Sequence, residues 1–253
     1  MKTRIYFLLL LILSLLTACG STNNDNVGAV LTQSESAKND SSSAQAAPST
    51  QNPQIEAYAA ALNGLYYDHI YPNGDTLPPS ADGDYSDLGL NQFAIYDIDN
   101  DDEDELLFLY SNTDFTKMQL IVYRYDTAFP GSLMVELVEA PDTTFYDNGM
   151  VQTAASNGEE TDTYLFYSYS PISDTYEYVA SVESWDKALS PDNFPDETDT
   201  DGDGTLYRFY LGPDEQIIDG PAYQDFLNSW IGDAKPVKIP YQAFTSENIV
   251  ALQ

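Results

Sequence analysis

The chain reads QFAIYDIDNDDEDELLFLY from Gln92 to Tyr110, and this stretch decides the fold. Two short runs of aliphatic and aromatic residues, Phe93–Tyr96 and Leu106–Tyr110, flank a segment in which Ile98 is the one apolar residue. Short apolar runs bounded by Asp and Asn are typical of β-strands, and two such runs joined by a polar loop predict a β-hairpin. The acidic segment is therefore expected to form the loop of that hairpin.

The predicted loop carries acids at alternate positions. Asp97, Asp99 and Asp101 occupy positions 1, 3 and 5, and Glu105 occupies position 9. Alternating acids in a tight loop turn their oxygens toward one point, and Ca²⁺ takes about six to eight oxygen ligands. An EF-hand is excluded, because the bidentate Glu that it needs at position 12 is Phe108 here. These four acids form the first candidate Ca²⁺ site, and a solvated acidic turn is the alternative interpretation.

A second acidic loop follows later in the chain. Its candidate ligands are Asp199, Asp201, Asp203 and the backbone carbonyl of Thr205. Gly204 supplies the glycine expected at position 6, where the first loop has Asp102. Aspartate adopts a left-handed backbone more readily than most residues, so the first loop can still close. The second loop lacks an acid at position 9, so a further carboxylate must come from Asp196, Glu197 or elsewhere in the fold, and a solvated turn is again the alternative.

Further strands are expected on both sides of the second loop. They are Met118–Tyr125, Leu133–Val138, Thr163–Tyr169, Tyr176–Val182, Leu206–Leu211 and Val237–Tyr241. Hairpin turns are expected at Asp147-Asn148-Gly149 and at Gly212-Pro213-Asp214. Sequential hairpins indicate an antiparallel sheet.

Three helices are expected around these strands. Apolar residues recur at helical spacing from Ile55 to His69, and Tyr223–Ile231 and Ser246–Leu252 predict short C-terminal helices. The predicted class is therefore α+β, with an N-terminal helix packed on an antiparallel β-meander that forms a curved sheet or a sandwich.

The start of the chain predicts a secretory signal. Lys2 and Arg4 precede the apolar run Ile5–Leu16, which is shorter than the roughly 20 residues of a spanning helix. The run closes with Leu16-Thr17-Ala18-Cys19, which resembles the lipobox of bacterial lipoproteins, in which the thiol receives a diacylglycerol and the signal is cut before it. Residues 1–18 are then the signal peptide and Cys19 is the lipidated first residue of the mature chain. An ordinary signal peptide followed by a free thiol is the alternative.

A tether is expected behind the lipid, over residues 19–53. The stretch from Gly20 to Asn52 is mostly Ser, Asn, Ala, Gln and Thr without an aromatic residue, so it cannot bury enough apolar surface to offset the entropy cost of ordering. Residues 54–253 are long enough for one core, and we expect a single α+β domain there. The predicted location is the extracytoplasmic face of the cell membrane.

Two resemblances follow from these motifs. The D-x-D-x-D loop, closed by an acid at position 9 and flanked by strands, is similar to the calcium loop of FG-GAP-type β-hairpins. The chain is also similar to a segment repeated through many uncharacterised lipoproteins of Gram-positive bacteria. The matching pieces are Asn91–Asp101, Glu105–Leu107, Phe145–Gly149, Tyr164–Tyr169, Tyr176–Val179, Ser184–Asp186 and Asp201–Gly204. This resemblance implies a lipid-anchored surface protein and no particular activity.

The net charge of the chain limits which classes of molecule are expected to bind it. It has 41 acidic residues against 9 basic ones, a formal net charge of −32, so nucleic acid is not an expected partner. The membrane is expected to be contacted through the lipid on Cys19. Solvent-facing tyrosines could bind a glycan or a protein. Alternating residues such as Tyr176 and Tyr178 could equally form one buried face and pack across strands, which is the interpretation we favour.

A surface hydrolase is the alternative to a binding or structural protein. The one cysteine is assigned to lipid, and the one histidine, His69, is expected to pack in the core, so Cys–His and Ser–His–Asp nucleophiles and histidine zinc sites are not expected. Paired carboxylates could still hydrolyse glycosides. Glu183 and Asp186 beside Trp185 are the best local pair, although Trp185 fits a core position better.

The sequence therefore predicts a cell-surface, lipid-anchored protein of binding or structural character with one or two Ca²⁺ loops. The alternative is a carboxylate-pair glycoside hydrolase or another surface hydrolase, and no catalytic residue is assigned.

Overall fold

The computed structural model describes residues 52–80, 82–155 and 163–253. The chain divides into two units, Met1–Ala47 and Pro48–Gln253, and the fold below belongs to the second. The predicted signal peptide, Cys19 and the predicted tether as far as Gln51 lie outside the described residues. None of the helices in the described ranges is both long and apolar enough to cross a membrane.

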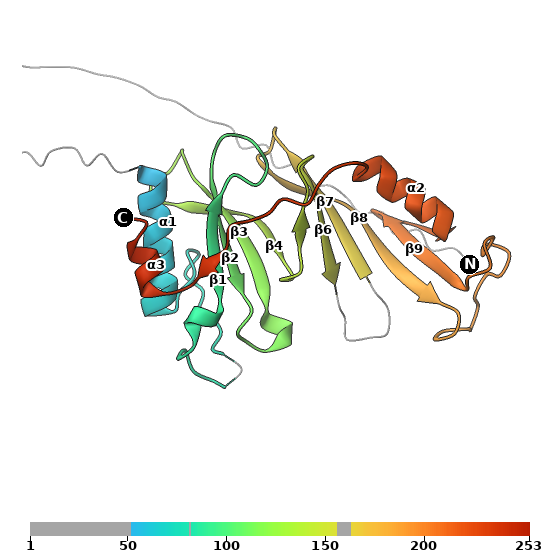
Figure 1. Ribbon diagram of the computed structural model, residues 1–253, viewed down its shortest axis with the longest axis horizontal. Helices are drawn as coiled ribbons and strands as arrows, with labels where there is room; N and C mark the ends of the chain where they lie inside the picture. The colour runs from blue at the N-terminus through green and yellow to red at the C-terminus, as the bar shows by residue number, and fades with distance from the viewer. Residues whose placement is uncertain (1–51, 81, 156–162) are drawn as a thin grey trace, which may run out of the picture. The chain divides into compact units, whose positions relative to one another are not determined.

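Two open antiparallel sheets and a few short helices make up this unit (Figure 1). The first sheet has the order β11-β1-β2-β3-β4, and the second has the order β10-β9-β8-β7-β6-β5. Neighbouring strands in each sheet follow one another along the chain, apart from β11. The predicted antiparallel α+β class is confirmed, with the strands divided between two sheets.

The boundaries agree with most of the expected elements. The first sheet contains β1 (Gln92–Tyr96), β2 (Glu105–Tyr110), β3 (Gln119–Tyr125), β4 (Leu133–Glu139) and β11 (Gln242–Ala243). The second contains β5 (Thr144–Phe145), β6 (Met150–Ala155), β7 (Thr163–Ser170), β8 (Thr175–Asp186), β9 (Thr205–Leu211) and β10 (Asp214–Asp219). The helical elements are α1 (Pro53–Asn63), η1 (Gly64–Asp68), η2 (Leu88–Leu90), η3 (Phe115–Lys117), α2 (Gly220–Trp230) and α3 (Ser246–Val250). Both predicted hairpin turns are present, between β5 and β6 and between β9 and β10.

The first hydrophobic cluster joins α1 and α3 to the first sheet. Asn52 caps α1 by accepting a hydrogen bond from the Gln54 amide, and Pro53 suits the first helical position. Tyr58 and Leu62 are fully buried against Phe93, Phe108 and other strand residues of this cluster. The apolar stripe of the predicted N-terminal helix therefore faces a sheet.

His69 does not lie on that apolar stripe, so its predicted position was wrong. The helix widens into the π-helical turn η1, which changes the phase of the side chains, and His69 ends the turn with a left-handed φ of 56°. Its ring is half-buried and stacks on Tyr85, with 3.7 Å between the ring centroids.

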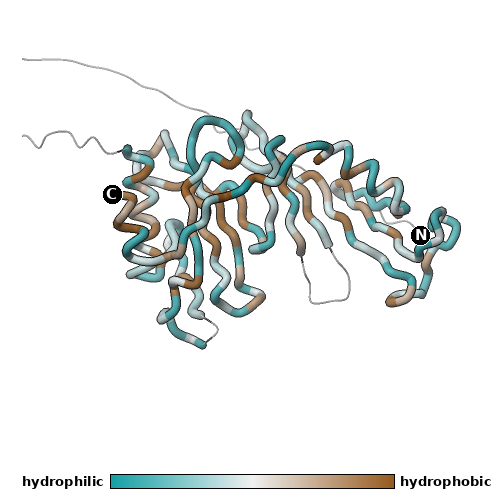
Figure 2. The backbone as a smooth tube through the Cα atoms, in the orientation of Figure 1, coloured by the Kyte–Doolittle hydropathy of each residue, from teal (hydrophilic) through white to brown (hydrophobic). Residues whose placement is uncertain are grey.

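A second cluster lies between the two sheets. Leu107 and Val122 of the first sheet share it with Val151 and Tyr176 of the second, and Ile98 enters it from the β1–β2 loop. β4 is the edge strand of the first sheet and contacts β8 of the second. Figure 2 shows hydrophobic residues along the strands and hydrophilic residues in the loops between them.

A third cluster packs α2 on the second sheet, and the chain then returns to the first sheet (Figure 1). The predicted strand Val237–Tyr241 was wrong. Val237 donates one hydrogen bond to the Phe145 carbonyl, yet a ladder forms only at β11. Pro236 and Pro240 lack the N–H donors that a continuous strand pairing would need.

Candidate metal centre

The predicted β1–β2 hairpin is confirmed, with Tyr96 paired to Glu105 and the acidic residues between them in the loop. Two contacts hold this loop in place. Ile98 is buried in the cluster between the sheets, and the Tyr58 hydroxyl donates a hydrogen bond of 2.6 Å to the Asp104 carbonyl. The loop is thus attached both to the core and to α1.

Backbone amides organise the outer part of the loop. Asp97 accepts hydrogen bonds from the amides of Asn100 at 2.7 Å and Asp102 at 3.3 Å, and Asp101 accepts from Glu103 at 2.8 Å. Asn100 and Asp102 have φ of 64° and 72°. The left-handed backbone expected at Asp102 is confirmed.

Three buried carboxylates meet beneath the loop. Asp99, Glu105 and Glu136 are 9%, 2% and 7% exposed, and one oxygen of each lies within 4.8 Å of the others. Asp99 forms a second group of the same size with Asp97 and Asp101. The predicted ligands Asp97, Asp99 and Asp101 therefore lie together. The fourth predicted ligand, Glu105, belongs to the other group, and Asp99 is common to both groups. Glu136 of β4 was not predicted from the sequence.

Several polar atoms in this buried group have no protein partner. Glu105 accepts a hydrogen bond of 2.9 Å from the Ile98 amide. Both oxygens of Asp99, Oε2 of Glu136 and the Tyr176 hydroxyl are buried without a hydrogen-bond partner among the residues that the structure describes. A buried polar group without a partner destabilises the folded state, so a proton or a cation is expected to satisfy these oxygens.

Burial and like charge raise the pKa of all three carboxyls. The pKa of Asp99 rises to about 7, mainly through burial and then through the charges of Asp101 and Asp97. Burial is also the main cause for Glu105, whose pKa rises to about 9, and for Glu136, whose pKa rises to about 8. The charge of Asp99 adds to both shifts, so ionisation of one carboxyl disfavours ionisation of its neighbours.

A series of polar contacts links the cluster to the second sheet. Arg124 lies 3.6 Å from Glu136 and 3.1 Å from Asp174 in the β7–β8 turn. The Tyr169 hydroxyl of β7 donates to Asp174 at 2.9 Å, and Asp101, at 3.3 Å, is an alternative acceptor for the same hydrogen. The Arg124 guanidinium carries a single positive charge, whereas the buried group beside it contains the three carboxyls of Asp99, Glu105 and Glu136.

The second loop has a similar backbone around a less buried group. Asp199 accepts hydrogen bonds from the amides of Gly202 at 2.9 Å and Gly204 at 3.2 Å, both of which have positive φ. One of its oxygens lies within 4.8 Å of one oxygen of Asp201 and one of Asp219. Asp219, the N-cap of α2, is therefore the acid from elsewhere in the fold that this loop required.

The other predicted members of the second loop lie outside this group. Asp203 accepts a hydrogen bond of 2.7 Å from the Thr205 amide, and Asp196 pairs with Lys187 at 2.6 Å. Asp219 accepts from the Thr200 amide and hydroxyl and from the Gly220 amide, and these bonds lower its pKa. Both carboxylate oxygens of Asp199 and both of Asp219 thus already accept hydrogen bonds from protein donors.

Glu183 and Asp186, the best local pair for glycoside hydrolysis, lie beside a tryptophan that is packed in the protein interior. Trp185 is buried, its indole N–H donates to the Ser190 carbonyl at 2.8 Å, and Arg208 lies 4.2 Å above its ring. Arg208 also faces Glu183 at 3.8 Å. The core position expected for Trp185 is confirmed, and its ring face is covered.

The cross-strand packing that we favoured for the tyrosines is confirmed for two pairs, but the single buried face is not, because Tyr176 is buried and Tyr178 is 48% exposed. Tyr167 stands opposite Tyr178 and Tyr169 stands opposite Tyr176, with ring centroids 5.9 Å and 5.6 Å apart. These rings contribute cross-strand packing.

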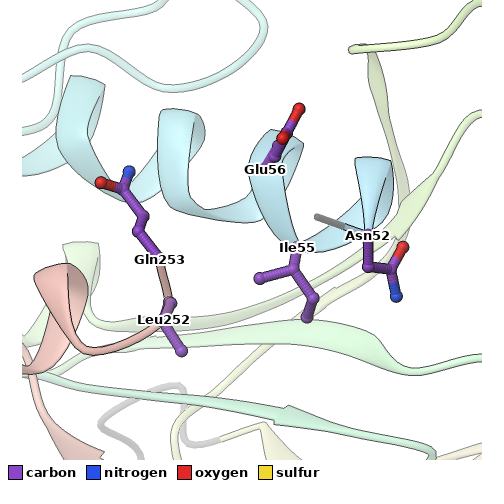
Figure 3. A pocket seen from close by; sticks show the side chains of 5 residues that line it. All are labelled: Asn52, Ile55, Glu56, Leu252 and Gln253. Carbon is purple, nitrogen blue, oxygen red and sulfur yellow. The ribbon is translucent and has the colours of Figure 1, made fainter. Parts of the chain in front are cut away.

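Two surface hollows are each lined by only one acidic side chain among the described residues. One lies between the start of α1 and the C-terminal residues (Figure 3) and measures about 490 Å³. Glu56 is the one acidic side chain among its five lining residues. The other, about 340 Å³, lies on β3 and β4 beside Tyr71, Asp75, Tyr123 and Val135.

Two acids of these groups were missed from sequence. Glu136 interrupts the apolar run Leu133–Val138, and a single acid within a strand pattern was the available signal. Asp219 precedes Gly220 and Pro221, a pattern typical of a helix N-cap, and the helix was predicted to begin only at Tyr223.

Comparison of the chain with protein-family models, with curated proteins and with solved structures gives no match. The chemistry of the centre is therefore inferred from its own side chains. Hard carboxylate oxygens, buried and mutually repulsive, suit a hard divalent cation better than a soft metal.

Proposed function

We propose that the chain is a lipid-anchored, extracytoplasmic protein of binding or structural character that binds Ca²⁺ at the β1–β2 loop. Asp97, Asp99, Asp101 and Glu105 would hold the ion. The main support for this proposal is that both oxygens of Asp99 are buried next to other carboxylates without a hydrogen-bond partner in the described part of the chain. Calcium accommodates irregular oxygen geometry, whereas Mg²⁺ requires near-octahedral coordination and sheds water reluctantly.

Hydrolysis by the same carboxylates is the less favoured function. The Asp99 oxygens and Glu136 Oε2 are buried, so a sugar ring cannot reach them, whereas a dehydrated ion can. A glycan or protein ligand would instead meet the surface. The hollow on β3 and β4 supports such a partner, because it combines the exposed apolar side chains of Val135 and Val138 with the carboxylate of Asp75.

Calorimetric titration tests the calcium site directly. The whole chain, purified in non-ionic detergent and freed of metal with chelator, should bind Ca²⁺ saturably at constant ionic strength. Mg²⁺ should bind more weakly, and Zn²⁺ should not displace Ca²⁺, because the ligands are hard oxygens. Absence of saturable Ca²⁺ binding would overturn the proposed function.

The lipid anchor predicts a separate result. Replacing Cys19 with Ala should abolish labelling by a fatty-acid probe and should release or mislocalise the protein, because the thiol is the proposed acceptor. Cys19→Ser is the matched control for the size of the side chain and should behave as Cys19→Ala does. Labelling that persists in both variants would contradict the anchor.

A further inference from the structure

Glu136 lies at an irregularity of β4 that turns its side chain inward. Val122 of β3 pairs with Leu137, and the next residue, Tyr123, pairs with Val135, so Glu136 has no partner in the register. A bulge of this kind places an extra residue in one strand and re-aims its side chain. Glu136 and Leu137 are both buried, while Val135 is exposed. Regular alternation would put Glu136 and Leu137 on opposite faces.

The contacts of Glu136 leave half of its carboxylate unused. Its side chain is 1% exposed and Oε1 lies 3.6 Å from Arg124 Nε. Oε2 is buried without a hydrogen-bond partner, and the carboxylate lies within 4.8 Å of oxygens of Asp99 and Glu105. If Glu136 served Arg124 alone, it would bring a third buried carboxylate to two others without compensation, and an apolar side chain would be less costly there.

We propose that Glu136 is a ligand of the cation at the β1–β2 loop, which rests on the proposed function above. Calcium binds oxygens at about 2.3–2.6 Å, so oxygens on one ion can be up to about 5 Å apart. The 4.8 Å grouping of Asp99, Glu105 and Glu136 meets this condition. The ion therefore joins the loop to β4 as well as to β2.

This ligand extends the effect of the ion to the second sheet. The Glu136 carbonyl accepts a hydrogen bond of 3.2 Å from the Thr175 hydroxyl of β8, and Arg124 connects the Glu136 carboxylate to Asp174. Both partners belong to the region where β7 turns into β8. Calcium bound by Glu136 thus fastens the two sheets at the edge where they meet.

The test compares Glu136→Gln with Glu139→Gln in the whole chain, titrated calorimetrically with Ca²⁺ alone. Glu139 lies on the same strand, accepts a hydrogen bond from Tyr167 and is outside the acidic group. Glu136→Gln should raise the Kd for Ca²⁺ at least tenfold, and Glu139→Gln should leave it within twofold. In chelator, Glu136→Gln should melt at a higher temperature than the wild type, because it removes one of three buried carboxyl groups that lie close together without a cation.

A role confined to the Arg124 ion pair would give the opposite pattern. Glu136→Gln would then melt lower in chelator and keep the wild-type Kd, and this result would overturn the proposal. Glu136→Asp keeps the charge but shortens the side chain, so it should also weaken Ca²⁺ binding; an unchanged Kd in this variant counts against direct ligation. Wild-type protein without Ca²⁺ binding identifies a failure of the proposed function itself, whereas wild-type binding retained by both Glu136 variants refutes the role of Glu136 alone.

Discussion

Replacing Asp97 and Asp99 with Ala should remove most of the rise in melting temperature that Ca²⁺ produces in the wild-type chain. Calcium at 100 times its Kd stabilises the folded state by about 2.7 kcal/mol, which corresponds to roughly 5–10 °C for a unit of this size. The reason is that the ion neutralises a cluster in which both oxygens of Asp99 are buried without a hydrogen-bond partner in the described part of the chain. Scanning calorimetry with Ca²⁺ and with chelator measures the difference.

The matched control is the same double change at Asp199 and Asp201. This pair should remove less of the calcium response, because Asp201 is exposed and accepts a hydrogen bond from the Asp203 amide, whereas Asp99 is buried without a hydrogen-bond partner in the described ranges. All scans need the same ionic strength, since added salt screens the large net charge of the chain without binding specifically. A melting temperature indifferent to millimolar Ca²⁺ and to chelator would reduce both loops to solvated acidic turns.

The metal-free protein should lose stability as the pH rises from 5 to 7. The pKa of Glu105 rises from its ordinary value near 4.5 to about 9 in the folded chain, so in this range the folded state holds a proton that the unfolded state has lost. Stability falls with pH wherever the folded state binds more protons, by about 1.4 kcal/mol per pH unit for each proton. Glu105 alone therefore predicts a loss of roughly 2–3 kcal/mol over two pH units, and Asp99 and Glu136 act in the same direction.

Urea unfolding in chelator at pH 5, 6 and 7 measures this slope. Carboxyls with a lowered pKa, such as Asp219, titrate below this window and do not oppose the trend. Saturating Ca²⁺ should flatten or reverse the slope, because the ion binds the ionised carboxylates and its stabilisation grows as they lose protons. Equal slopes with and without Ca²⁺, or a rise in stability with pH in chelator, would contradict the link between the buried carboxylates and the metal.

The sequence by itself determined the local elements of this protein. The strands flanking Asp97–Glu105, the turn at Asp147-Asn148-Gly149 and the apolar stripe of α1 are confirmed, because each depends on neighbouring residues in the chain. The alternation of acids in the first loop likewise indicated which side chains would meet. Where a local pattern failed, as at His69 and at Val237–Tyr241, a π-helical turn and two prolines altered the local geometry.

Only the tertiary structure decided how the strands divide into two sheets and which distant acids complete the clusters. Glu136 is far from Asp99 in sequence and reaches it because a bulge in β4 turns the side chain to the interior. Asp219 reaches the second loop because it caps α2 at the end of β10. Side-chain periodicity cannot indicate a register shift or a pairing between separate sheets, since both depend on how the core packs as a whole. Burial supplied the decisive difference between the two loops. At position 3 of the same D-x-D-x-D pattern, Asp99 is buried and its oxygens have no hydrogen-bond partner among the described residues, whereas Asp201 is exposed and accepts a hydrogen bond from the Asp203 amide.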